Sequence, residues 1–121
     1  MHELNKPEYR RVAAIFDGTT NSRPVVLSAV ERNIESRIVA DDRDGPKTAL
    51  IILDDMFFLR GEKNIEFINE IYTFLIRGIF PYAAWEFCEL YCLSENLRGD
   101  VKKIFTPVIH KELIRNTFTF D

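Results

Sequence analysis

The spacing of hydrophobic positions alternates along the chain between the period of a helix and the period of a strand. Apolar residues recur at intervals of three and four in four segments, which predicts four helices. Asn5 followed by Glu8 is a helix-capping signal before the first of them, and Asn64 and Ser94 are cap residues before the third and fourth. The segments are residues 6–17, 24–33, 65–79 and 95–106.

The other periodic segments predict strands. Thr48 to Leu53 is apolar almost throughout, as expected of a central strand covered on both faces. Asp54 and Asp55 connect it to the next strand, because Asp tolerates the left-handed conformation that a hairpin needs. The predicted strands are residues 34–40, 48–53, 56–61, 83–92 and 110–120.

Two of these assignments have a competing interpretation. Residues 24–33 contain Val-Val-Leu-Ser-Ala-Val, which also fits a strand because β-branched residues favour strands. Residues 83–92 alternate as a strand does, with Trp85, Glu89 and Tyr91 on one face, but a helix is a reasonable rival. With either choice, the order of elements predicts an α+β fold: a mixed, mostly antiparallel sheet with helices on its faces.

Length and composition fit one globular domain spanning residues 1–121, with 46% hydrophobic and 29% charged residues. The formal net charge is −3 and no basic cluster exceeds two residues, which argues against nucleic acid as a main partner. No apolar run reaches the roughly 18 residues of a membrane span, and the N-terminus has no apolar signal region. We therefore expect no membrane partner and a cytoplasmic protein.

The two cysteines, Cys88 and Cys92, are four residues apart. On a strand their Cα atoms would lie about 13 Å apart, which is too far for a disulfide. We expect both to be reduced core cysteines, because free Cys is among the most buried residue types.

The stretch Ala-Asp-Asp-Arg-Asp-Gly-Pro-Lys-Thr, residues 40–48, raises the possibility of a calcium loop or a phosphate loop. A calcium loop with Gly45 at its sixth position lacks the first ligand and the final glutamate, which would fall at Ala40 and Ile51. A phosphate loop needs a second glycine and a following helix, and neither is present. The sequence instead predicts a polar turn that leads into a strand, and no metal site.

No catalytic constellation is recognisable. The glycines, at 18, 45, 61, 78 and 99, are too far apart for a loop that wraps a pyrophosphate, so we expect no nucleotide or coenzyme site in this chain. Spacing alone leaves open a pairing of His110 with one of the cysteines. A small enzyme that uses Glu89, Arg115 or His110 is a further alternative.

Short patterns along the chain resemble the N-terminal part of a two-part acetyltransferase family of the GNAT superfamily, which includes zwittermicin-resistance-like proteins. They are a Leu-to-Tyr helix start, an apolar strand ending in Asp-Asp, a Pro-x-x-Ala, a Phe-x-x-Gly hairpin end and a late strand led by Arg. They correspond to Leu4 to Tyr9, Ile38 to Asp42, Pro46 to Ala49, Phe58 to Gly61 and Arg115 to Phe120.

The resemblance implies a degenerate, GNAT-like half without catalytic residues. In that family the acetyl-CoA loop, [QR]-x-x-G-x-[GA], lies in a C-terminal part, and nothing here matches it. The chain would then be the N-terminal domain of a larger protein, packing on the catalytic half and helping to form the acceptor-substrate cleft. The alternative is a stand-alone interaction module, with a homodimer as one form. Residues expected at the cleft or interface are Asp41, Asp42, Arg60, Trp85 and Arg115, although Asp41 and Asp42 also fit a solvated turn.

Overall fold

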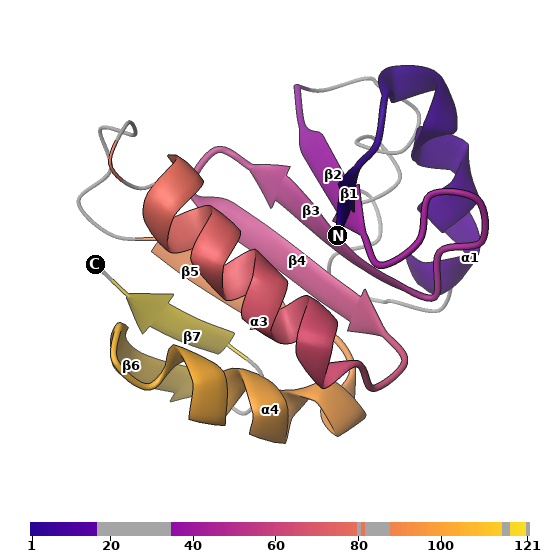
Figure 1. Cartoon of the computed structure of the whole chain (residues 1–121). Helices are drawn as coiled ribbons and strands as arrows, with labels where there is room; N and C mark the ends of the chain where they lie inside the picture. Colours follow the sequence, from indigo (N-terminus) through magenta and orange to yellow (C-terminus); the bar gives the residue numbers. More distant parts are fainter. Residues whose placement is uncertain (17–34, 80, 82–87, 115–116, 121) are drawn as a thin grey trace.

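The computed structural model of the chain is an α+β fold, as the sequence predicts, built on one mixed sheet (Figure 1). It describes residues 1–16, 35–79, 81, 88–114 and 117–120, with residues 109–114 and 117–120 described by their backbone. Within this part of the chain, seven strands lie in the order β1-β2-β3-β4-β5-β7-β6. Their bounds are β1 His2–Glu3, β2 Arg37–Ala40, β3 Thr48–Leu53, β4 Met56–Gly61, β5 Cys88–Cys92, β6 Ile109–Ile114 and β7 Thr117–Phe120.

The described strands pair antiparallel with one exception, the parallel pair of β4 and β5. Because parallel neighbours need a crossover connection, a helical segment links these two strands across one face of the sheet. The helical segments are η1 Lys6–Val12, α1 Ala13–Phe16, α3 Ile65–Thr73, η2 Phe74–Ile79 and α4 Glu95–Phe105. Here η1 is a 3₁₀ helix and η2 is a π-helical continuation of α3.

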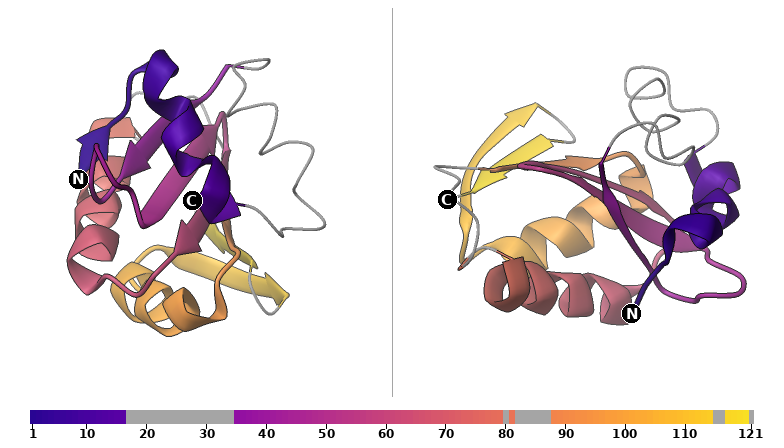
Figure 2. Two further views of the ribbon diagram at one scale, coloured as in Figure 1. Left: turned by 90° about the vertical axis from the view of Figure 1, so that its right-hand side faces the viewer. Right: turned by 90° about the horizontal axis from the view of Figure 1, so that it is seen from above.

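The helices form layers on both sides of the sheet. Figure 2 shows α3 and α4 against one face and α1 on the other, while β6 and β7 turn steeply away from the plane of β2 to β4. Since side chains alternate along a strand, β3 supplies both layers, and all six of its residues are buried. Leu50 and Ile52 pack under α3, whereas Ala49 and Ile51 pack under α1.

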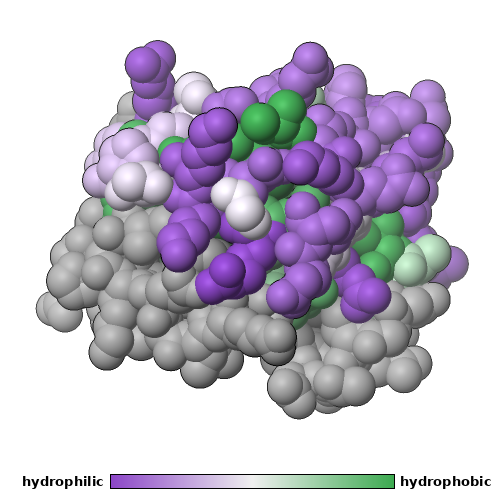
Figure 3. Space-filling view, turned by 90° about the horizontal axis from the view of Figure 1, so that it is seen from below, coloured by the Kyte–Doolittle hydropathy of each residue, from purple (hydrophilic) through white to green (hydrophobic). Residues whose placement is uncertain are grey.

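Local sequence signals explain the helix that crosses between β4 and β5. The Asn64 side chain accepts a hydrogen bond from the Phe67 amide at 3.0 Å, the cap that the sequence predicts. Phe67, Ile68 and Ile71 face the core, and the exposed residues of the helix are polar except Ile65 at its start. In a view from below, the described surface is mostly hydrophilic with small apolar patches (Figure 3).

Several other predictions agree with the structure. The strands over residues 48–53 and 56–61 are confirmed at both ends, and Asp54 between them adopts a positive φ of 53°. The helix after Ser94 is confirmed, and so is the strand prediction for the described part of 83–92, Cys88–Cys92. Both cysteines are buried thiols that form no disulfide with each other.

The prediction of one strand over residues 110–120 is wrong. The segment forms two antiparallel strands, β6 and β7, with Ile114 opposite Thr117. The sequence pattern of alternating residues runs on without a break between Ile114 and Thr117, so it does not reveal that the chain reverses there. Asn116, a common turn residue, is the local signal that would have indicated the reversal.

Two more differences concern the N-terminal part. The two-residue strand β1 was not predicted, because it is too short to show any period. The predicted helix over 6–17 is observed to Phe16, with 3₁₀ geometry in its first seven residues. The prediction of a helix over 24–33 lies outside the described residues, as do residues 83–87 of the predicted strand.

Candidate functional site

Strands β4 and β5 end side by side, and hydrogen bonds from nearby residues occupy the space at their carboxyl ends. The Leu93 amide donates to the Leu59 carbonyl at 2.7 Å, which continues the parallel ladder beyond β5. The Gly61 amide donates to Ser94 Oγ at 3.0 Å, and Asn96 Nδ2 reaches the Gly61 carbonyl at 3.4 Å. We refer to these five residues as the β4–β5 junction. The Gly61 amide and carbonyl, the Leu93 amide and the Leu59 carbonyl therefore all have hydrogen-bond partners within the chain.

Gly61 is held in the junction by a conformation that only glycine adopts readily. Its φ is +141°, and a Cβ built on it would lie 2.3 Å from the Lys47 carbonyl oxygen. On the same side, Thr48 Oγ1 donates to the Glu62 carbonyl at 2.7 Å, and the Glu62 amide donates to the Lys47 carbonyl at 3.1 Å. The end of β4 is therefore fixed to β3 as well as to β5.

Next to the junction, side chains of the chain itself also form a hydrogen bond and an ion pair at the start of α3. Asn64 already accepts the Phe67 amide, which a ligand at this helix end would otherwise contact. Lys63 Nζ lies 3.8 Å from Asp100 Oδ2, a buried oxygen with no hydrogen-bond partner in the described structure. This ion pair connects the β4–α3 loop to α4.

The second feature is the face of β4 and β5 on the α1 side. Phe58 and Tyr91 are register partners, and their rings stack with centroids 5.1 Å apart and an interplanar angle of 11°. Arg60 pairs with Ala49 of the α1-side core, so its side chain leaves the sheet on this side too. We call this surface the Arg60 face: Met56, Phe58, Arg60, Glu89, Tyr91 and Leu93.

Tyr91 and Glu89 form a polar pair on the Arg60 face. Tyr91 Oη donates to Glu89 Oε2 at 2.9 Å. Burial raises the pKa of Tyr91, and the hydrogen bond to Glu89 and the charges of Glu89 and Asp55 raise it further. A raised pKa keeps the phenol protonated at neutral pH, so Tyr91 retains the hydrogen that it donates to Glu89.

The cysteine that follows on β5 is equally unreactive. Burial raises the pKa of the Cys92 thiol to about 11, and Cys92 Sγ lies 3.4 Å from the Ser94 carbonyl oxygen. The thiolate is the nucleophilic form of cysteine, so this thiol is a poor nucleophile at neutral pH. Cys92 belongs to the core under α3 and α4 rather than to the Arg60 face.

Asp41, one of the predicted cleft residues, organises the turn between β2 and β3. Its Oδ1 accepts the amides of Lys47 and Thr48 at 3.0 and 3.2 Å, and its own amide donates to the Thr48 carbonyl at 3.1 Å. Asp is well suited to this arrangement, because its short side chain bonds nearby backbone. The stretch is a polar turn before a strand, as the sequence predicts.

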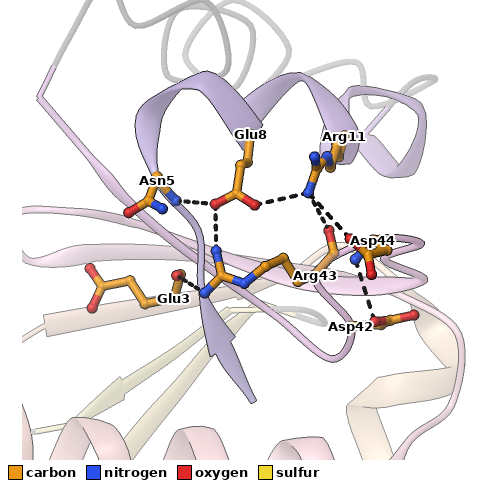
Figure 4. A network of polar contacts seen from close by, with 7 residues as sticks. All are labelled: Glu3, Asn5, Glu8, Arg11, Asp42, Arg43 and Asp44. Carbon is orange, nitrogen blue, oxygen red and sulfur yellow. Dashed lines mark hydrogen bonds and ion pairs between the residues drawn. The ribbon is translucent and has the colours of Figure 1, made fainter.

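Asp42, the second of these residues, is exposed and accepts the Asp44 amide at a long 3.4 Å. The rest of the turn is attached to η1 through Glu8 (Figure 4). The Glu8 carboxylate accepts from Arg43 at 2.5 Å, from Arg11 at 2.8 Å and from the Asn5 amide at 2.8 Å. This network fixes the turn to the first helix, and neither aspartate forms a hydrogen bond or ion pair with Arg60 in the described structure.

The five predicted site residues are therefore not gathered in one described cluster. Asp41 and Asp42 lie in the β2–β3 turn, and Arg60 lies on the Arg60 face. Trp85 and Arg115 lie outside the described residues. Sequence reasoning missed the contact between Ser94 and Gly61, because nothing local indicates a hydrogen bond between residues so far apart in the chain.

Among the described residues, no group of three or more His, Cys, Asp or Glu side chains could hold a metal ion. No helix in the described ranges is long and apolar enough to cross a membrane. No model of a known protein family matches the sequence, and a search of curated proteins finds no significant match.

Proposed function

We propose that this chain is a non-catalytic, acetyltransferase-like domain that packs on a catalytic domain and helps to form the cleft for the acceptor substrate. One observation carries the proposal: the closed β4–β5 junction. In sheets with parallel strands, ligands bind in the crevice at the carboxyl ends of the strands, often with a phosphate at a helix N-terminus. Here that position is filled by Ser94, Asn96 and the cap of α3.

The electrostatics of the described residues support the same proposal. A catalytic acid or base needs a pKa near the working pH. The pKa of Glu8 is lowered by its hydrogen bond to the Asn5 amide and by Arg43 and Arg11, while the pKa values of Tyr91 and Cys92 are raised. Each shift favours the form that the group already has at neutral pH, so none of these three groups has its pKa moved toward neutral pH, as proton transfer would require.

The proposal is tested by calorimetric titration of acetyl-CoA into the purified chain, with its mass in solution measured alongside. We expect no saturable binding, meaning a Kd weaker than about 1 mM, and a monomer. Because the junction blocks the crevice through Ser94, the double variant Ser94→Gly, Asn96→Gly is the matched control for a site that is merely masked. Its folding is checked first by circular dichroism.

The outcomes separate the alternatives. Saturable binding of acetyl-CoA by the unmodified chain contradicts a non-catalytic domain. A stable dimer without acetyl-CoA binding favours the stand-alone interaction module instead. A monomer without binding is the expected result for a domain whose partner is a separate catalytic unit.

A further inference from the structure

Arg60 is a half-buried cation without a partner in the described part of the chain. Its guanidinium makes no hydrogen bond and no ion pair with the described residues. Arg43, which is also half-buried, illustrates the contrast, because it donates to Glu8 and to the Glu3 carbonyl. A guanidinium carries five donors in a fixed fork, and leaving them unpaired while partly removed from water is costly.

The surroundings of Arg60 are those of a protein interface rather than of a solvated surface. Leu93 and Tyr91, on the strand beside it, are each partly buried and pack on the α1-side core. The Phe58 ring beneath Tyr91 is 2% exposed and holds the tyrosine flat in the stack. Aromatic residues, Met and Arg are the types enriched at the centre of interfaces, where rigid rings provide contact area at little entropic cost.

The charge of this face limits what can bind there. A carboxylate matches the guanidinium fork with two parallel hydrogen bonds. A long polyanion does not fit, because Glu89 lies on the same face and the chain carries a net charge of −3. The complementary ligand is a short segment with one carboxylate and one apolar side chain.

We propose that the Arg60 face binds an acidic segment of the partner domain, with a carboxylate on Arg60 and an apolar side chain against Tyr91 and Leu93. This inference rests on the proposed function, since it names the surface through which the partner domain packs. Tyr91 Oη, already bonded to Glu89, then orients the stack rather than competing for the carboxylate.

The experiment is an NMR titration of the full chain, labelled with nitrogen-15, using the probe peptide acetyl-Phe-Gly-Asp-amide. The neutral peptide acetyl-Phe-Gly-Asn-amide is the control. We expect the acidic peptide to shift the amide signals of Arg60, Tyr91 and Leu93, and to bind about tenfold more tightly than the neutral one, the effect of one charge-assisted contact.

Substitution of Arg60 sharpens the test. Arg60→Gln should remove the preference for the acidic peptide, Arg60→Lys should retain part of it, and the exposed Arg77→Gln on η2 should change nothing. An unchanged amide spectrum elsewhere verifies that each variant is folded. Equal affinity for the two peptides, or a preference that survives Arg60→Gln, overturns the inference.

The outcomes remain distinct from those of the proposed function. Binding of acetyl-CoA would contradict the proposed function whatever the peptides do. Absence of both peptide and acetyl-CoA binding would leave the non-catalytic domain standing and reject the Arg60 face as its docking surface. Self-association of the chain that Arg60→Gln abolishes would make a second copy the occupant and overturn the partner-domain inference.

Discussion

The Gly61 amide at the end of β4 donates to the hydroxyl of Ser94, the residue that begins α4. Ser94 stands at the N-cap position, but its side chain makes no capping hydrogen bond within the helix. Its hydroxyl therefore connects the end of β4 to the residue before α4 instead of accepting a helix amide. The consequences for stability and for ligand access both follow from this one contact.

Replacement of Ser94 by Ala should lower the free energy of unfolding by about 1 kcal/mol, the usual contribution of a hydrogen bond, because it leaves the Gly61 amide without its acceptor. Urea denaturation at neutral pH measures the change. Asn96→Ala is the control, since its contact with Gly61 is long, at 3.4 Å, and exposed. An equal decrease in the free energy of unfolding for the two variants would contradict a specific contribution from the Ser94 hydroxyl.

Substitution of glycines at two positions should have opposite effects. Gly61→Ala should destabilise the protein by about 3 kcal/mol or more, because a positive φ and a backbone collision act together. Gly99→Ala should stabilise it by about 0.5–1 kcal/mol, because alanine is the better helix former and nothing lies within 4 Å of the added methyl group. Thermal unfolding followed by circular dichroism compares them. A folded, stable Gly61→Ala variant would refute the conformation described for β4.

The pKa of Glu8 gives a pH dependence with a definite sign. Its pKa is lowered in the folded protein by the Asn5 amide and by Arg43 and Arg11, so Glu8 stabilises the fold above its ordinary pKa of 4.5. That contribution is lost as the pH falls through the folded value. Glu8→Gln should therefore be less stable than the wild type at neutral pH, and the difference should narrow in acid.

Urea denaturation at a series of pH values measures this narrowing. The matched control is Glu62→Gln, whose exposed carboxylate makes no hydrogen bond or ion pair with the described residues. It should leave the free energy of unfolding at neutral pH unchanged. A constant difference between Glu8→Gln and the wild type across the acid range would mean that the network of Figure 4 does not depend on the charge of Glu8.

The cysteines should resist modification while the protein is folded. At about pH 8, close to the ordinary pKa of a thiol, a thiol reagent should react slowly with Cys88 and Cys92 and rapidly once guanidinium chloride unfolds the chain. The raised pKa of Cys92 also predicts the direction in which stability changes with pH. The unfolded thiol ionises near 9.0 and the folded one near about 11, so stability should fall as the pH rises above 9.0. Fast labelling of the folded chain would contradict the burial of both thiols.

The parts of the fold that the sequence predicts well are those that depend on neighbouring residues. Thr48 to Gly61 shows this, because two apolar runs and the Asp54 turn are all encoded within fourteen positions. Asp41 is similar, since its side chain bonds the backbone of its own turn. The split of the last predicted strand was missed, because its alternation runs unbroken across the reversal before Thr117.

The candidate site was less predictable, because it depends on residues that meet only in the folded sheet. The sequence places Glu89 and Tyr91 on one face of a strand, but not the stacking of Tyr91 on Phe58. It marks Ser94 as a helix start, but not as the acceptor of the Gly61 amide. Pairing of β4 with β5 decides both, and no local pattern specifies which strands become neighbours.

The single parallel pairing also has a kinetic consequence. It joins an antiparallel block, β1 to β4, to a second antiparallel block, β5 to β7. The β3–β4 and β6–β7 hairpins join strands close in sequence, whereas Leu59 and Leu93 are brought together only by closing the long connection through α3. Because loop closure slows folding, we expect these hairpins to form early and the β4–β5 pairing to form after them. Destabilising changes at Leu59 or Leu93 should then accelerate unfolding while leaving the refolding rate nearly unchanged, a division that stopped-flow kinetics can measure.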